Sequence, residues 1–341
     1  MDEIVRAFTC GRCGQLVFFE NSLCLRCSTP LGFVPSELDL VALTDNRVAA
    51  GDWRRCGNAA VAECNWMLEA GDPGPMCRSC RLTRTRPSDA DPAGLAAFAK
   101  AEGAKRWLLF GLFNLGLEVD DDRPAFDLLS SRSGPVVTGH DNGVITIDLA
   151  ESDDARREQR RSELGEPYRT ILGHFRHEIA HYYWPIMIER SGGLERWRSL
   201  FGDERLDYND ALARHYEIGP PPDWSDRHVS AYAAAHPWED WAETFAHYLH
   251  IRDTLQTAAA YRVVVAGPPA ANDSSLTAAP APDGGEGSFR GIVRDWLPVT
   301  YALNAINRSM GRDDLHPFTL APTVIDKLAF IHDRVRPNRD Q

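Results

Sequence analysis

All eight cysteines of this 341-residue chain lie within its first 80 residues, and their spacing restricts what that part can fold into. The first four follow the pattern C-x₂-C-x₁₀-C-x₂-C, in which two tight turns each offer two thiolates to one tetrahedral Zn²⁺. So small a module buries too little apolar surface to fold without metal. The pattern therefore predicts a zinc ribbon over residues 1–34 with four ligands: Cys10, Cys13, Cys24 and Cys27.

The other four cysteines are spaced less regularly, as C-x₇-C-x₁₂-C-x₂-C, but they also supply four thiolates. Disulfides are the alternative, and a redox role for one C-x-x-C pair is another. Residues 1–6 are charged, unlike a secretory signal peptide, and the C-x-x-C spacing favours metal in a reducing compartment. We therefore expect a second structural zinc module over residues 35–86. Its predicted ligands are Cys56, Cys64, Cys77 and Cys80.

Charge is distributed unevenly along the chain. Residues 1–87 carry equal numbers of acidic and basic side chains, so the remainder carries the whole net charge of −12. A negatively charged body repels nucleic acid, which makes nucleic acid an unexpected partner. One basic cluster could contact phosphate or an acidic partner, or could form a solvated edge beside the second zinc module. It consists of Arg78, Arg81, Arg84 and Arg86.

The hydrophobic content of 43% is ordinary for a globular protein. No apolar run approaches the roughly 18 residues of a membrane-spanning helix. Together with cysteines spaced for metal, this composition predicts a cytoplasmic protein without a membrane partner.

Residues 177–181 read H-E-x-x-H inside an apolar stretch that should form a buried helix. Residues four apart share one helix face, so His177 and His181 can reach one Zn²⁺ with Glu178 beside it. Zinc lowers the pKa of a bound water to about 7, so Glu178 could act as a general base near neutral pH. The motif predicts hydrolysis, most often of a peptide bond, and needs a third metal ligand.

A second helix, expected over residues 238–261, offers that ligand. Glu239, Glu243 and His247 lie four apart on one stripe, between aromatic residues that would face the core. One acid can complete a His₂Glu site with a position open for water, and the acid one turn away can hold a ligand histidine by its second nitrogen. Packing of Ala242 favours Glu239 as the ligand and Glu243 as the support. Asp240 and Glu243 are alternative ligands, and a solvated charged face is the alternative for the whole stripe.

The remaining pattern predicts the organisation of the third region. Residues 87–92 read as a linker, 94–117 as a helix, and 144–149 as a strand that is either a substrate-pairing edge or internal to a sheet. Further helices are expected at 194–201, 208–216, 289–309 and 323–335, and Pro185 should end or kink the H-E-x-x-H helix. Residues 267–287 are low in complexity and predict a mobile loop.

The E-x-x-A-E pattern from Glu239 to Glu243 resembles the second zinc motif of gluzincin metallopeptidases, especially the lethal-factor-like group. The resemblance implies that Glu239 is the ligand. It also implies that a tyrosine seven residues earlier, here Tyr232, stabilises the oxyanion.

The whole chain is similar to a bacterial family of zinc-binding metallopeptidases with an N-terminal zinc ribbon. The resemblance implies an α+β fold: a mainly helical zincin-type domain with a small sheet, over residues 92–341, preceded by the two Cys₄ modules. It does not identify a substrate. The matching stretches are CRSCRLTRT at 77–85, GHDNGVITI at 139–147, GEPYRT at 165–170, GHFRHE at 173–178, HPWED at 236–240 and YALN at 301–304.

Two functions follow from these patterns. The first is a peptidase with one catalytic and two structural zinc ions, acting on a peptide or protein substrate. The second is a binding or regulatory protein in which the ribbons recruit a protein partner and the zincin fold is an inactive or restrained scaffold. Retention of Glu178 favours the enzyme, because a scaffold has no use for a base beside an open metal position.

Overall fold

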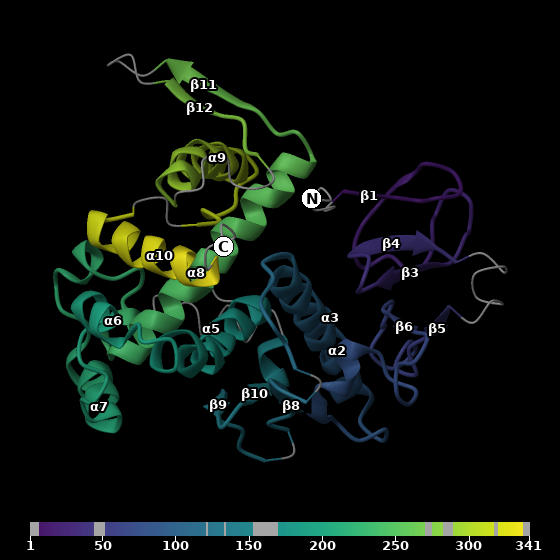
Figure 1. Cartoon of the computed structure of the whole chain (residues 1–341), viewed down its shortest axis with the longest axis horizontal. Helices are drawn as coiled ribbons and strands as arrows, with labels where there is room; N and C mark the ends of the chain where they lie inside the picture. The colour runs from purple at the N-terminus through teal and green to yellow at the C-terminus, as the bar shows by residue number, and fades with distance from the viewer. Residues whose placement is uncertain are drawn as a thin grey trace. The chain divides into compact units, whose positions relative to one another are not determined.

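The computed structural model divides the chain into two compact units, Met1–Arg157 and Glu158–Gln341 (Figure 1). It describes residues 7–43, 52–120, 122–132, 134–152, 170–269, 275–281, 289–316 and 320–336. The domain boundaries expected at residues 34, 86 and 92 stay predictions.

The first unit begins with two antiparallel hairpins. Strands β1 (Phe8–Thr9) and β2 (Leu16–Val17) form the first, and β3 (Leu31–Val34) and β4 (Asp39–Ala42) form the second. Their aromatic side chains pack on helix α3 (Pro92–Asn114), where the rings of Phe19 and Phe110 stack at 4.9 Å. The first cysteine module and this helix therefore share one apolar core.

The second cysteine module follows with β5 (Trp53–Arg55), β6 (Met67–Glu69) and the short helix α2 (Arg78–Arg81). Val34 of the first module is buried together with Val41, Trp53 and Met67 of the second. A Cβ at Gly32 would lie 2.5 Å from the Met67 sulfur, so only glycine permits this close approach. Packing thus joins the two modules beyond their metal clusters.

Helix α3 begins where Asp91 accepts a hydrogen bond from the Gly94 amide at 2.9 Å and Pro92 takes the first turn. The helix also carries a fully buried ion pair, in which Lys105 donates to Glu102 at 2.7 Å. The helix expected at 94–117 is therefore present, three residues shorter at its C-terminal end.

A four-stranded sheet completes the first unit. Its order is β7 (Thr83–Thr85), β8 (Ala125–Leu129), β10 (Val144–Asp148) and β9 (Gly139–Asp141). Strand β10 pairs with β8 on one side and β9 on the other, so the internal strand is observed and the substrate-pairing edge was wrong. The alternation of apolar and polar residues in 144–149 indicates which side chains are buried. It does not indicate which strands lie beside this one, because those come from other parts of the chain. A short 3-10 turn, η1 (Leu149–Ser152), follows.

The second unit is built on two packed helices, α5 (Ile171–Trp184) and α8 (Pro237–Ala260) (Figure 1). Trp241 of α8 donates its indole N–H to the Ala180 carbonyl of α5 at 2.8 Å. Thr170 caps α5, and Pro185 ends it by starting a π-helical turn, η2 (Pro185–Glu189), as expected. The buried aromatic side chains between α5 and α8 hold the two helices in fixed register.

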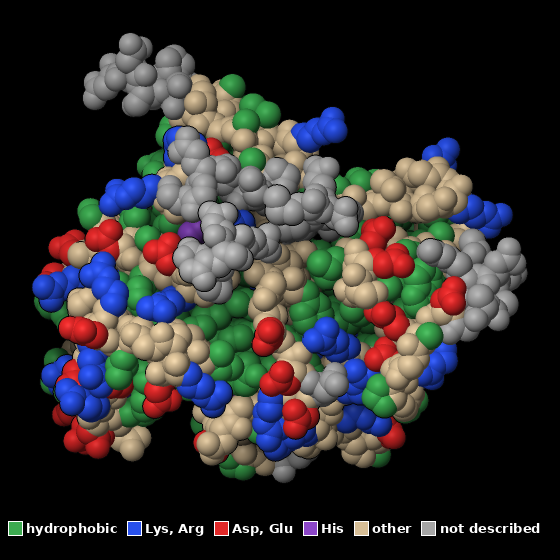
Figure 2. All heavy atoms as spheres, in the orientation of Figure 1, with side chains coloured by type: hydrophobic (Ala, Val, Ile, Leu, Met, Phe, Trp, Pro, Cys, Tyr) green, Lys and Arg blue, Asp and Glu red, His purple; other side chains and the backbone are tan. Residues whose placement is uncertain are grey.

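Shorter helices surround this pair: α6 (Leu194–Phe201), α7 (Tyr208–Ile218), α9 (Phe289–Ser309) and α10 (Pro322–Val335). Two 3-10 turns, η3 (Trp224–Asp226) and η4 (Tyr232–Ala234), precede α8. Figure 2 shows acidic and basic side chains interspersed over α6 and α7, without a region of one sign. None of the described helices has the length and apolarity that crossing a membrane requires.

Part of the expected loop at 267–287 is a hairpin. Strand β11 (Val265–Pro269) pairs antiparallel with β12 (Ser275–Ala278), so the loop prediction was wrong for these residues, and the rest of it mostly lies outside the described residues. A Cβ at Gly267 would lie 2.7 Å from the Leu276 carbonyl oxygen. Low complexity concealed a strand that needs glycine for close pairing. The α+β class, mainly helical with small sheets and preceded by two cysteine clusters, is confirmed.

Candidate metal centres

The first four cysteines converge as their spacing predicted. Their sulfur atoms all lie within 4.8 Å of one another. The Sγ atoms of Cys10 and Cys27 are 3.7 Å apart, as are those of Cys13 and Cys24, and none of the eight cysteines forms a disulfide. The disulfide alternative is therefore wrong, and four thiols at this spacing fit one tetrahedral zinc ion.

The second cluster is more deeply buried. All four of its cysteines are buried, whereas Cys13 and Cys27 of the first cluster are partly exposed. The backbone amides of Asn58 and Cys77 both donate to the Cys56 sulfur at 3.4 Å. Hydrogen bonds from Cys64, then Cys77, also lower the pKa of the Cys56 thiol. Donors aimed at sulfur stabilise a thiolate, which is the form that binds zinc.

The third group lies in the second unit and consists of His177, His181 and Glu239. The two Nε2 atoms are 3.3 Å apart, and Glu239 Oε2 lies 3.1 Å from Nε2 of His177. Ligands bound at zinc distances of about 2.0–2.1 Å in a tetrahedron are separated by about 3.3 Å. Oε2 is buried and, apart from the nearby His177 ring, has no hydrogen-bond partner among the described residues. The three groups therefore fit a zinc ion that would satisfy this oxygen.

Glu243 supports the first of these histidines. Its Oε1 lies 2.7 Å from His177 Nδ1, and Ser230 donates to its Oε2 at 2.7 Å. Burial raises the pKa of Glu239 and Glu243, but hydrogen bonds from His177 lower both to about 2. Both are therefore carboxylates at neutral pH. Glu243 fixes the histidine ring so that Nε2 faces the other two ligands.

The predicted catalytic residues lie in the same unit. Glu178 follows His177 on α5 and is buried. The Tyr232 ring, on η4, lies 6.1 Å from the His177 ring. Burial raises the pKa of the Tyr232 phenol, so it remains a proton donor at neutral pH. The structure thus brings Tyr232 and the H-E-x-x-H helix together, while their chemical roles stay predictions.

Two contributors were missed by sequence reasoning. Tyr208, the first residue of α7, donates its hydroxyl hydrogen to Glu239 Oε1 at 2.7 Å, and Ser230 supports Glu243 as described above. Neither stands at a diagnostic spacing from the motif, because each arrives from a separate turn of chain. Two histidines outside the ligand set have structural partners: His236 caps α8 by accepting from the Trp238 amide, and His140 accepts from the Gly143 amide in the first unit.

Three arginines of the basic cluster form ion pairs inside the first unit. Arg81 pairs with Asp72, Arg84 with Asp127 and Arg86 with Asp89. The solvated-edge interpretation therefore fits better than a phosphate-binding surface.

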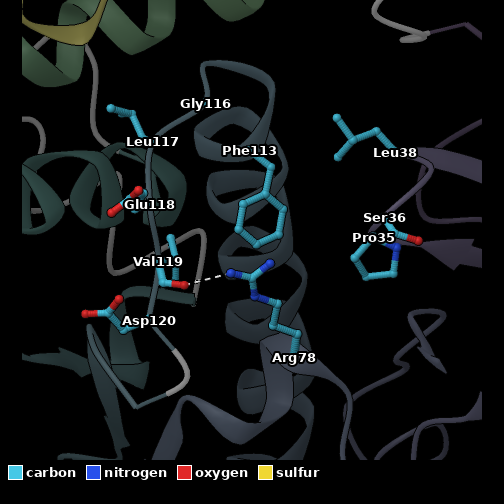
Figure 3. Close-up of a pocket in the computed structure, with 10 residues that line it drawn as sticks. All are labelled: Pro35, Ser36, Leu38, Arg78, Phe113, Gly116, Leu117, Glu118, Val119 and Asp120. Carbon is cyan, nitrogen blue, oxygen red and sulfur yellow. Dashed lines mark hydrogen bonds between the residues drawn. The ribbon is translucent and has the colours of Figure 1, made fainter. Parts of the chain in front are cut away.

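The fourth member of the cluster, Arg78, borders a cavity of about 590 Å³ (Figure 3). Its guanidinium lies 4.7 Å from the Phe113 ring centre and donates to the Val119 carbonyl at 2.7 Å. Glu118 and Asp120 also line this cavity, so it does not present a positive surface to an anion.

Comparison with known proteins decides the family. Residues 94–334 match the family described as "Putative zinc-binding metallo-peptidase". The chain belongs to this zinc-binding metallopeptidase family. Residues 7–91 match a zinc-ribbon domain, in agreement with the cysteine clusters.

Similarity to mycobacterial proteins covers almost the whole chain. An uncharacterized protein of Mycobacterium bovis and two from Mycobacterium tuberculosis strains are each 49% identical to it over 344 residues. The alignments cover 98% of this chain and 97% of each relative. No solved structure matches the chain.

Proposed function

We propose that this protein is a zinc-dependent peptidase that hydrolyses peptide bonds in a peptide or protein substrate. The observation that carries the proposal is the convergence of His177, His181 and Glu239 around one point, with Glu178 on the same helix. Membership of a zinc-binding metallopeptidase family supports it. A site with three protein ligands leaves a fourth position for water or substrate, as catalytic zinc sites do.

The zinc ion, when bound, supplies Lewis acidity that polarises the peptide carbonyl and makes water a stronger acid. Glu178 takes a proton from the attacking water through its carboxylate and passes it to the leaving amine. Tyr232 donates its phenol hydrogen to the carbonyl oxygen as negative charge develops there. Glu243, held by Ser230, orients His177. We propose one catalytic zinc in a gluzincin-type site and two structural ions in the cysteine clusters.

The two cysteine modules have a separate role in this proposal. With their metal bound they are folded surfaces that could recruit a protein substrate or partner. They could also restrain the catalytic unit. A comparison of the full chain with one that begins near residue 91 distinguishes these roles.

The decisive experiment compares the wild type with Glu178→Gln, which keeps size and polarity but removes the base. Both proteins are incubated with lysate of the source bacterium, and new peptide termini are identified by mass spectrometry. Cleavage that depends on Glu178 should fall by at least about 100-fold, the low end for general-base catalysis. Zinc content and thermal stability of the variant should match the wild type.

The same comparison can reject the proposal. If no cleavage depends on Glu178, in the full chain or in the shortened one, the protein is a zinc-containing binding protein. If cleavage is gained only on shortening, the cysteine modules restrain the catalytic unit. If it is lost on shortening although the shortened chain keeps its fold and its zinc at His177 and His181, they recruit the substrate.

A further inference from the structure

Tyr208 holds one oxygen of the candidate ligand Glu239. Its hydroxyl donates to Oε1 at 2.7 Å, and Oε2 lies 3.1 Å from His177 Nε2. The two carboxylate oxygens thus have different surroundings. One is bound to a phenol, and the other faces the imidazole nitrogens.

This asymmetry affects how many coordination positions of the metal the Glu239 carboxylate fills. Oε1 is only 3.7 Å from Nε2 of His181, so without a competing donor it could also reach a metal between the histidines. Carboxylates bind metals through one oxygen or through both. A second oxygen on zinc would add a ligand atom beside the position that a catalytic site keeps for water. A hydrogen bond on Oε1 opposes this.

His236 holds Tyr208 in place. Its Nδ1 accepts from the Trp238 amide at 3.1 Å, so the ring proton is on Nε2, which donates to the Leu206 carbonyl at 3.2 Å. Only 2% of this histidine is exposed, and its ring packs 5.2 Å from the ring of Tyr208. One side chain therefore links the N-terminus of α8, which carries Glu239, to the segment that carries Tyr208.

Helix α7 contributes little apolar packing of its own. No side chain of α7 is buried, and its C-terminal residues Tyr216 and Ile218 are 65% and 75% exposed. Helix α7 is therefore not fixed by an apolar core of its own. Its placement beside the site depends on the bonds at its first turn, to Glu239 and through Leu206 to His236, and on ring contacts of Tyr208 with Trp238 and of His215 with Tyr232.

We propose that Tyr208 is a positioning residue that restricts Glu239 to one oxygen on the catalytic zinc, with His236 holding Tyr208 in register. A four-coordinate zinc, with water as its fourth ligand, is then a product of this hydrogen bond as well as of the ligand count. This inference rests on the proposed catalytic zinc site.

Cobalt substitution tests it without relying on activity. In the full-length protein, zinc is left in the cysteine clusters, and the His₂Glu site is emptied with a chelator and refilled with Co²⁺. Coordination geometry is then read from the visible absorption of the bound cobalt. The wild type should show the strong absorption of four-coordinate cobalt. In Tyr208→Phe the absorption should fall several-fold, because a fifth ligand atom enters. Zinc affinity should fall by no more than about 10-fold.

Three further variants separate positioning from other effects. Tyr232→Phe should lower turnover and change the cobalt spectrum less than Tyr208→Phe does, because the Tyr232 hydroxyl contacts Tyr208 and reaches Glu239 only through it. Tyr216→Phe, exposed on the same helix, should change neither. His236→Asn retains a helix cap but cannot reach the Leu206 carbonyl, so it should shift the spectrum in the direction of Tyr208→Phe.

The outcomes distinguish this inference from the proposed function. A wild-type spectrum in Tyr208→Phe overturns the inference, even if activity falls, and leaves the peptidase proposal standing. Failure of the wild type to bind Co²⁺ or Zn²⁺ at His177 and His181 overturns both.

Discussion

The two cysteine clusters and the proposed histidine–glutamate zinc centre differ in how many ligands the chain supplies. Each cluster takes four thiols from a short stretch of chain, so its coordination shell is complete. The other centre takes two imidazoles from α5 and one carboxylate from α8, and leaves one position open. A closed shell contributes folding free energy, whereas an open one gives substrate and water access to the metal.

The support around the ligands differs in the same way. Cys56 is stabilised by amides of its own module, while His177 is held by Glu243 and, through that acid, by Ser230. Helices α5 and α8, which carry the three candidate ligands, also have an apolar core independent of metal, including Phe175 and Phe245. Losing metal should therefore unfold the first unit and leave the second folded.

The largest expected effect follows removal of a buried thiol. Cys77→Ser should abolish zinc binding at the second cluster, and with it a metal contribution of about 10–16 kcal/mol to folding of such modules. We expect proteolysis of the first unit under conditions where the wild type resists, with the His₂Glu centre still loaded. Limited proteolysis and elemental analysis measure both. A protease-resistant first unit without this zinc would show that its apolar core suffices.

His177→Ala should remove one zinc ion of three and leave the fold intact. The α5–α8 core contains the Trp241 to Ala180 hydrogen bond and does not need this imidazole. Zinc content by elemental analysis and thermal unfolding would be compared with the wild type. Full zinc content in the variant contradicts the assignment of this site, and loss of the folded second unit contradicts its independence from metal.

The third effect separates the ligand acid from the supporting acid. Glu243→Gln should weaken zinc binding by about 10–100-fold, the usual result of losing the partner of a ligand histidine. Glu239→Ala should abolish it, and Ser230→Ala should cost less than Glu243→Gln. Competition with a chromophoric chelator gives the three affinities. The reverse order for the two acids would make Glu243 the ligand.

The smallest effect is that of low pH on the stability of the second unit. We expect it to arise from protonation of buried histidines. Burial lowers the pKa of His316 to about 3, and its Nε2 lies 2.5 Å from that of His250. Below the unfolded value of about 6.5 the unfolded chain binds a proton that the folded chain does not. Stability is therefore present above this value and lost as the pH falls from about 6.5 towards 3.

His316→Gln removes this titration but can still accept from His250. Its unfolding free energy should decline less steeply with acid than that of the wild type, by up to about 1.4 kcal/mol per pH unit. Chemical denaturation at several pH values between 6.5 and 5 measures the difference. Parallel slopes would show that His316 is protonated in the folded protein.

The sequence fares best where chemistry is local. C-x₂-C turns and the H-E-x-x-H helix each need only neighbouring residues, so spacing predicted both cysteine clusters and the alignment of His177 with His181. Helices α6 and α9 were placed at their observed ends for the same reason, since capping and periodicity are properties of a short segment.

Long-range pairing was beyond such reasoning. Strand β10 could not be assigned to an edge or an interior position, and the β11–β12 hairpin was read as a loop, because strand neighbours come from distant parts of the chain. The first cysteine module was expected to depend on metal alone. Its aromatic core with α3 adds packing that no local pattern reveals.

For the candidate catalytic centre, the sequence by itself determined the residue types and their helical spacing: two imidazoles, a base and a stripe of acids. Only the tertiary structure decided how these are used. It set Glu239 against the histidine Nε2 atoms and Glu243 against Nδ1, and it brought Tyr208 to the free face of the ligand carboxylate. The physical reason is that a helix fixes which side chains share a face, whereas the packing of separate helices fixes which atoms meet.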